Sequence, residues 1–280
     1  MPKINFYGCS FSDGGGMDRW DWFQVIKDEE WVNPRSREKI LKQGDFGGFN
    51  DCLYVFKNQH KFSTVVGKKL GCDIGDYAYT ANNNQNIRDE VWNNIREDDG
   101  KIHIVQWSIA ERFKLWYDET GKFYRIQGNP YDQVAYEDNS GNKLSLDVYQ
   151  IKDLQNFQTT RLLKHFNMQY EMRKVEMYTE LLHSFAYDKG HHIYFMFHDM
   201  PNEAVVKPSA NVITFDGLHL GNWTRENELT ITAESKNAIL EDDHYSREGN
   251  ILIANKIIET LRADKVINDD EKFLNERNLI

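Results

Sequence analysis

The sequence predicts an α/β protein, a three-layer α/β/α sandwich built around a mainly parallel sheet. Two observations lead to this prediction. Short β-rich segments alternate along the chain with segments of helical periodicity, and this alternation is typical of parallel strands joined by helical crossovers. One strand candidate, His192–Phe197, is an almost continuous apolar run. A strand of that composition is covered on both faces, as in a sheet between two layers of helices.

The first half of this framework is predicted to hold three strands and two helices. The expected strands are Lys3–Tyr7, Asp73–Tyr79 and Lys101–Trp107, and the expected helices are Phe62–Leu70, which ends at Gly71, and Gln85–Arg96. Glycine is the residue that most readily adopts the left-handed conformation at a helix end. We therefore place the end of the first helix at Gly71.

The second half begins with a β-hairpin and ends with a helix. Two short β-rich segments, Phe113–Tyr117 and Lys122–Ile126, flank a turn that contains Gly121. After a long helical stretch of one or two helices, the expected elements are the strand at 192–197, a last strand at Val212–Phe215 and an amphipathic helix at Asn250–Leu261. The element order favours a single domain over residues 1–280, with insertions at about 13–58 and 113–147.

Composition restricts the partners of the protein. The chain has 34 Lys+Arg and 44 Asp+Glu, a net charge of −10, which disfavours binding along a nucleic-acid backbone. It has no apolar run long enough to span a membrane and no apolar signal-peptide segment at its start. We expect a soluble protein without membrane or nucleic-acid partners, cofactor or bound metal. Its three cysteines are too few and too scattered for a disulfide framework.

Polar residues follow three of the predicted strands, where ligands bind in parallel sheets. Ser10 lies in a sharp turn after the first strand and offers a hydroxyl and a backbone N–H. An Asn-rich loop at 82–86 follows the second strand. After the third strand, Ser108 offers a hydroxyl, and Arg112 pairs either with a substrate carboxylate or with a structural acid such as Glu111.

Two Asp–His segments lie near the C-terminus, and either supplies a general base for a serine. One ends in His219, three residues after Asp216, and the other runs from Asp242 to His244. A base of this type needs a carboxylate that holds the second imidazole nitrogen. We favour His244, because a helix is expected directly behind it, whereas a polar stretch at 221–235 follows His219.

Several of these segments resemble sequence blocks of the SGNH/GDSL hydrolase superfamily, in particular its divergent phage-type and bacterial members. Gly8-Cys9-Ser10-Phe11-Ser12 resembles the first block, Gly-Asp-Ser-x-Ser, and the segment from Asp242 to Ala254 resembles the fifth, in which the His precedes a helix. The segments at 77–87 and 105–112 stand where the second and third blocks occur. Ala81 there replaces the usual Gly, and the usual Asn of the third block is missing.

The resemblance implies a five-stranded, flavodoxin-like sheet and a serine esterase without a cofactor. Its site would use Ser10 as nucleophile, His244 as base and Asp242 as the orienting acid, with Asp243 or Glu241 as alternatives. Oxyanion donors would be the N–H groups of Ser10 and Ala81 and the Ser108 hydroxyl; substrate contacts would come from Asn84, Trp107 and Arg112.

The implied substrate is an acyl ester, such as an acetylated carbohydrate or a small ester, and the implied location is cytoplasmic or virion-associated. The altered oxyanion blocks leave a second interpretation open: a module of the same fold that has lost catalysis and serves in carbohydrate binding or as a viral structural component. The sequence gives less support to a cysteine nucleophile or a metal site. Cys9 is expected to pack inward, and His191, His192 and His198 are expected to be structural rather than metal ligands.

Overall fold

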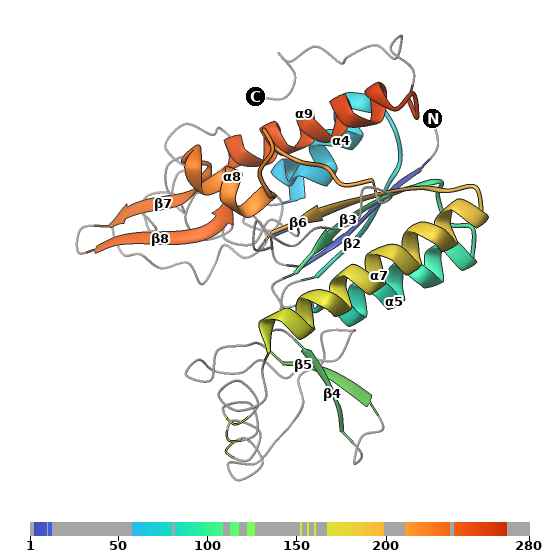
Figure 1. The fold of residues 1–280 in the computed structure, drawn as a ribbon. Coiled ribbons are helices and arrows are strands. Elements are labelled where there is room, and N and C mark those ends of the chain that lie inside the picture. Colours follow the sequence, from blue (N-terminus) through green and yellow to red (C-terminus); the bar gives the residue numbers. More distant parts are fainter. Residues whose placement is uncertain are drawn as a thin grey trace, which may run out of the picture.

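Four parallel strands form the central sheet, in the order β2–β1–β3–β6 (Figure 1). They are β1 (Ile4–Gly8), β2 (Ile74–Ala78), β3 (Ile102–Trp107) and β6 (His192–Phe197). A single parallel bridge from Val212 to Phe195 lies on the outer side of β6, in the fifth position of the sheet. The α/β class and the parallel sheet predicted from the sequence are thus confirmed.

This computed structural model describes residues 3–9, 11–12, 58–79, 82–108, 113–117, 122–126, 152, 156, 160, 167–198, 211–235 and 238–267. Within these ranges, the side chains of β4, β5 and residues 231–243 are not described. The insertion expected at 13–58 falls almost entirely outside the described residues, as do residues 127–147 of the second insertion.

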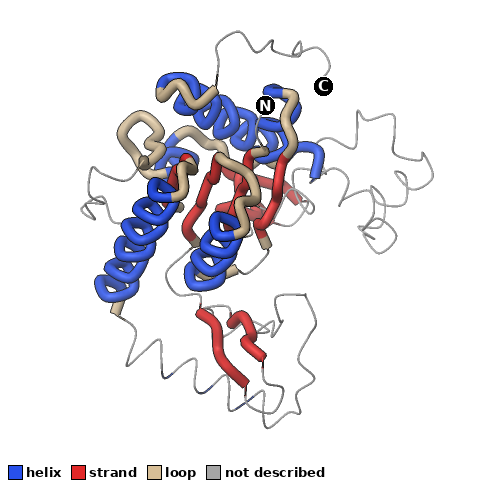
Figure 2. The backbone as a smooth tube through the Cα atoms, turned by 90° about the vertical axis from the view of Figure 1, so that its right-hand side faces the viewer, coloured by secondary structure: helices blue, strands red, loops and turns tan. Residues whose placement is uncertain are grey.

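Helices cover both faces of the sheet, which makes three layers (Figures 1 and 2). On one face α4 (Phe62–Leu70) packs against α9 (Arg247–Ala263), and on the other α5 (Asn84–Arg96) packs against α7 (Met168–Asp188). Successive strand residues point to opposite faces, so each strand contributes to two cores. In β1, for example, Phe6 belongs to the core under α4 and α9, whereas Tyr7 belongs to the core under α5 and α7.

Local sequence signals place the ends of these helices. Gly71 ends α4 in the left-handed conformation, with φ of 63°. The side chains of Asn83, Asn167 and Ser246 cap α5, α7 and α9 by accepting a hydrogen bond from a backbone N–H in the first turn. The helices predicted at 62–70, 85–96 and 250–261 are confirmed. The predicted stretch at 147–187 is confirmed for α7; most of its first part is not described.

Two β-hairpins lie outside the central sheet. The first pairs β4 (Phe113–Tyr117) with β5 (Lys122–Ile126), as the sequence predicts. The second pairs β7 (Thr230–Ser235) with β8 (Ala238–Tyr245), directly before α9. The prediction missed this second hairpin and the short helix α8 (Leu220–Glu226) that precedes it, because both lie in a polar stretch without clear periodicity.

The predicted last strand at Val212–Phe215 is wrong as a regular strand. Only Val212 pairs with β6, and Phe215 pairs instead with Leu218 across a tight turn. Both central residues of that turn, Asp216 and Gly217, have positive φ, which strand residues do not adopt. The chain therefore leaves the sheet after one bridge. Within the described residues, no helix is both long enough and apolar enough to cross a membrane.

Candidate functional site at the carboxyl edge of the sheet

The strands end together at one edge of the sheet, since Gly8 pairs with Ala78 and Trp107 pairs with Phe197. At the end of β1 the chain turns so tightly that Ser12 folds back over Gly8. A Cβ atom on Gly8 would overlap the Ser12 side chain and would lie 3.5 Å from Cβ of Gln106. The absence of a side chain at Gly8 therefore lets Ser12 pack against the end of β1.

The Asn-rich loop connects the ends of three strands. Asn82 donates from Nδ2 to the carbonyl of Gly8 over 3.0 Å. Asn84 accepts from the backbone N–H of Ser108 over 2.7 Å and donates back to the Ser108 carbonyl over 3.1 Å. These bonds fix the loops after β1, β2 and β3 relative to one another.

This geometry corrects the expectation that Asn84 contacts substrate. The side chain is buried, and both its oxygen and its nitrogen bind the backbone of Ser108. Asn84 therefore positions Ser108, whose own side chain is also buried. The oxyanion role expected for the Ser108 hydroxyl stays a prediction.

Trp107 is likewise not at the surface of the site. Its side chain is 1% exposed, and Nε1 donates to Oγ1 of Thr179 on α7 over 2.9 Å. Its ring stacks on Phe195 within the core under α5 and α7. This corrects the prediction of a substrate contact, because an indole covered by the core on this side of the sheet cannot reach a ligand.

The structure brings His244 against Phe11, the residue that follows the candidate nucleophile in sequence. The imidazole of His244 stacks on Phe11 with ring centroids 4.5 Å apart, and Phe11 directly follows Ser10. The pairing of β8 with β7 skips Asp243 and His244: Tyr245 pairs with Thr230, and Asp242 pairs with Ile231. Such an irregularity redirects side chains and is frequent next to active sites.

Four other predicted members of the site are described only by their backbone or lie outside the described residues. Ser10, Ala81 and Arg112 lie outside the described residues. Asp242 lies in β8, two residues before His244, but only its backbone is described.

A second imidazole lies at this edge, that of His198, for which the sequence predicted a structural role but no place in the site. His198 follows β6 directly and is 2% exposed. It stacks on Phe11 with ring centroids 3.6 Å apart, and its Nδ1 lies 2.8 Å from the hydroxyl oxygen of Tyr245. The rule that residues after parallel strands face ligands would have found His198, had it been applied to the fourth strand.

His219, the alternative base, lies at the start of α8 as its N-cap residue and does not cap the helix with its side chain. Phe197 packs edge-on against its ring at 5.7 Å. Burial lowers its pKa, because desolvation disfavours the charged imidazole. A helix, α8, does follow His219, so the expectation that only His244 has a helix directly behind it is wrong. The preference for His244 depends instead on its contact with Phe11.

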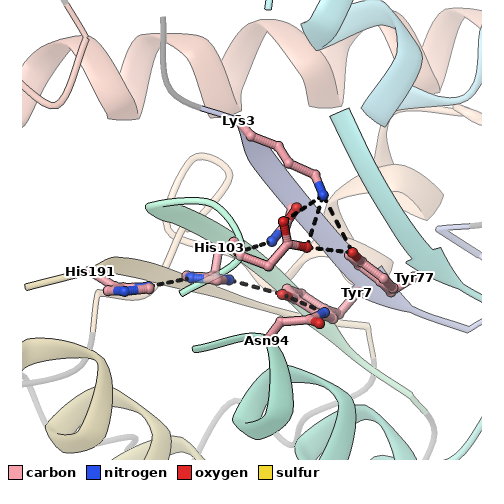
Figure 3. Close-up of polar contacts among 8 residues, drawn as sticks. Lys3, Tyr7, Tyr77, Asn94, His103 and His191 are labelled. Carbon is pink, nitrogen blue, oxygen red and sulfur yellow. Dashed lines mark hydrogen bonds and ion pairs between the residues drawn. The ribbon is translucent and has the colours of Figure 1, made fainter. Parts of the chain in front are cut away.

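A separate polar cluster occupies the opposite, amino-terminal edge of the sheet (Figure 3). There Lys3 forms an ion pair of 2.8 Å with Asp99, and the Tyr77 hydroxyl donates to the same carboxylate over 2.6 Å. The bond from Lys3 and then that from Tyr77 hold the pKa of Asp99 below its usual value. This part of the cluster neutralises its own charges and ties β1 and β2 to the turn before β3.

The rest of that cluster is a chain of hydrogen bonds through two histidines (Figure 3). His103 Nδ1 lies 2.9 Å from the Tyr7 hydroxyl, and its Nε2 lies 2.9 Å from Nδ1 of His191. His191 in turn lies 2.8 Å from Asp98. Burial lowers the pKa of His103 to about 3, so the chain is neutral at His103. His191 thus has the structural role expected for it, as a link between His103 and Asp98. His192 is exposed.

Metal and thiol chemistry gain no support from the described part of the chain. It contains no group of three or more His, Cys, Asp or Glu side chains arranged to hold a metal ion. Cys9 is fully buried in the core under α4 and α9. This burial confirms that Cys9 packs inward.

No protein-family model matches the sequence, and no curated protein matches it. Among solved structures, the chain is similar to a protein assigned to the G-D-S-L lipolytic family from Desulfitobacterium hafniense DCB-2. The two share 9% sequence identity and a TM-score of 0.38, and the match covers 92% of this chain and 99% of that chain. Similarity at this level fixes no correspondence between residues, so the site rests on the contacts of this chain.

Proposed function

We propose that the chain is a serine ester hydrolase of the SGNH type, with Ser10 as nucleophile, His244 as general base and Asp242 as the orienting acid. The observation that carries this proposal is the stacking of His244 on Phe11 at 4.5 Å. It brings an imidazole from the end of β8 to the residue after Ser10, at the carboxyl edge of a parallel sheet. Ligands bind at this edge in sheets of this kind.

The reaction follows from the chemistry of these groups. His244 removes the proton of the Ser10 hydroxyl as the oxygen attacks the ester carbonyl, and the same proton passes to the leaving alcohol. The backbone N–H groups of Ser10 and Ala81 and the hydroxyl of Ser108 donate to the oxyanion. A water molecule, deprotonated by His244, then releases the acyl group and restores Ser10.

The substrate proposed is an acetyl ester on a carbohydrate. Aromatic rings suit sugar faces, and the insertion at 13–58 contains Trp20, Trp22 and Trp31. Arg112 would contact an acidic group of such a substrate.

Hydrolysis of 4-nitrophenyl acetate by four proteins tests the proposal: wild type and the variants Ser10→Ala, His244→Ala and His219→Ala. We expect activity in wild type and His219→Ala, and a loss of at least a hundredfold in the other two. Loss in His219→Ala with activity kept in His244→Ala would reverse the choice of base. An inactive wild type that binds acetylated oligosaccharide would instead support the non-catalytic carbohydrate-binding module.

A further inference from the structure

One buried amide connects the two segments that carry the candidate catalytic residues. Gln106 on β3 is fully buried, and both ends of its side chain are engaged. Its Oε1 accepts a hydrogen bond from the Ser12 hydroxyl, and its Nε2 donates to the Tyr245 hydroxyl over 2.7 Å. Ser12 follows Ser10 by two residues, and Tyr245 directly follows His244. Gln106 is therefore a bridge of one side chain between the turn of Ser10 and the end of β8.

The donors and acceptors define a direction for this chain. An amide N–H can only donate, so the Tyr245 oxygen accepts from Gln106. We assign the Tyr245 proton to the bond with Nδ1 of His198, 2.8 Å away. His198 is then a neutral imidazole that carries its proton on Nε2. With this assignment every link has one donor and one acceptor, and a buried hydrogen-bonded network of this kind favours one arrangement.

Contacts of the Phe11 ring connect this series of hydrogen bonds to His244. Phe11 stacks on His198 at 3.6 Å and on His244 at 4.5 Å, and its ring centroid lies 5.7 Å from that of Tyr245. The backbone of Tyr245 is held as well, because Asn250 on α9 donates from Nδ2 to its carbonyl over 3.1 Å. Tyr245 is thus fixed at both its hydroxyl and its carbonyl, and the residue before it is His244.

We infer that Gln106 and Tyr245 are positioning residues that hold His244 in reach of Ser10. Ser12 and His198 are the two ends of this series of hydrogen bonds. This inference rests on the proposed function for the identity of the reacting groups. Neither residue touches the ester. They act by restricting the position of the base relative to the nucleophile, and a displacement of about 1 Å at a catalytic group can lower a rate on the order of a hundredfold.

Tyr245→Phe and Gln106→Met are the test variants, because each keeps much of the side-chain volume while removing hydrogen-bonding atoms. Thr179→Val is the matched control: it removes the buried 2.9 Å bond to Trp107, which lies in the other core. We expect kcat for 4-nitrophenyl acetate to fall tenfold to a hundredfold in both test variants with KM nearly unchanged. The control should keep the wild-type kcat, and all three should remain folded by circular dichroism.

A second readout does not depend on activity. In ¹⁵N spectra of protein labelled at histidine, wild-type His198 should show a neutral ring protonated on Nε2, and His244 should give one sharp set of ring signals. Tyr245→Phe should change the His198 tautomer signals and broaden or shift those of His244, whereas Thr179→Val should change neither. Ser12→Ala, which breaks only the far end of the chain, should give a smaller change of the same kind.

The outcomes separate the two proposals. If Ser10→Ala is inactive but Tyr245→Phe and Gln106→Met keep the wild-type kcat, the positioning role is overturned and the hydrolase stands. If wild type shows no hydrolysis, the hydrolase fails, and the His244 signals alone decide the inference. Unchanged His244 signals in both test variants would contradict it, and changed signals would support it.

Discussion

At the scale of single residues, Gly8 determines how closely Ser12 packs on the end of β1. A methyl group at this position would overlap the Ser12 side chain and press toward Gln106. The restriction comes from packing alone, since Gly8 is not among the glycines with positive φ. Neighbouring side chains, rather than backbone conformation, require glycine here.

Gly8→Ala is therefore expected to lower the free energy of unfolding by about 1–3 kcal/mol, the usual cost of overpacking, and to reduce esterase activity. Urea unfolding measures the first effect. The double variant Gly8→Ala/Ser12→Gly removes the overlapping side chain and should recover part of the stability. A double variant less stable than the sum of the two single changes would show that the clash is not with Ser12.

The buried imidazole of His103 leads to a prediction about how the stability of the protein depends on pH. Its imidazole has a pKa of about 3 in the folded protein, with burial as the largest cause, against about 6.5 in an unfolded chain. Between these values the unfolded state binds the extra proton, so stability is complete above about pH 6.5 and falls as the pH drops toward 3. The slope from this one group is up to about 1.4 kcal/mol per pH unit.

Denaturant unfolding at a series of pH values between 7 and 4 measures this slope. The Tyr7 hydroxyl oxygen accepts from Asn94 over 3.2 Å and lies 2.9 Å from Nδ1 of His103. His103→Asn should flatten the acid side of the profile, while His192→Gln, at an exposed position of β6, should leave it as in wild type. Equal slopes in wild type and His103→Asn would rule out this group as the cause.

At the scale of elements, Asn250 joins the starts of two helices to the end of β8. It is fully buried on α9, accepts from the backbone N–H of Phe62 at the start of α4 over 3.0 Å, and donates to the carbonyls of Tyr245 and Ser246. A buried backbone group left without its partner costs about 1–3 kcal/mol. This one amide therefore stabilises the packing of α4 on α9 and the position of the candidate base together.

Asn250→Ala is expected to lower the unfolding free energy by at least about 3 kcal/mol. Asn93→Ala on α5 is the control, because Asn93 is an exposed helix position. We expect it to cost less than about 1 kcal/mol. Thermal unfolding of both variants measures the difference, and equal costs would contradict the role of Asn250.

The elements that the sequence predicted correctly are those with a strong periodic or capping signal. Helices α4 and α9 combine an apolar face with a clear end or cap, and β6 is an apolar run. The segment from 220 to 245 was missed because α8, β7 and β8 are polar, and a polar hairpin is specified by pairing with its neighbour rather than by local composition. The position of His244 was difficult to predict for the same reason, since this residue lies at the irregular end of β8.

At the scale of the whole molecule, the sheet separates two polar networks. The carboxyl edge holds Phe11, His198 and His244 next to the turn of Ser10, whereas the amino edge holds the chain through His103 and His191 (Figure 3). The general rule for parallel sheets predicted which edge to inspect. It could not predict that the side chains of Asn84 and Trp107 would form hydrogen bonds inside the protein, because their partners, Ser108 and Thr179, are distant in sequence.

The central claim is that His244 activates Ser10, and labelling by a fluorophosphonate tests it most directly. Such a probe bonds only to an activated hydroxyl, and mass spectrometry of the digested protein locates the adduct. The account predicts one adduct on Ser10 in wild type, a labelling rate at least a hundredfold lower in His244→Ala, and the wild-type rate in His219→Ala. A wild-type protein without an adduct on Ser10, or equal labelling of wild type and His244→Ala, would contradict it.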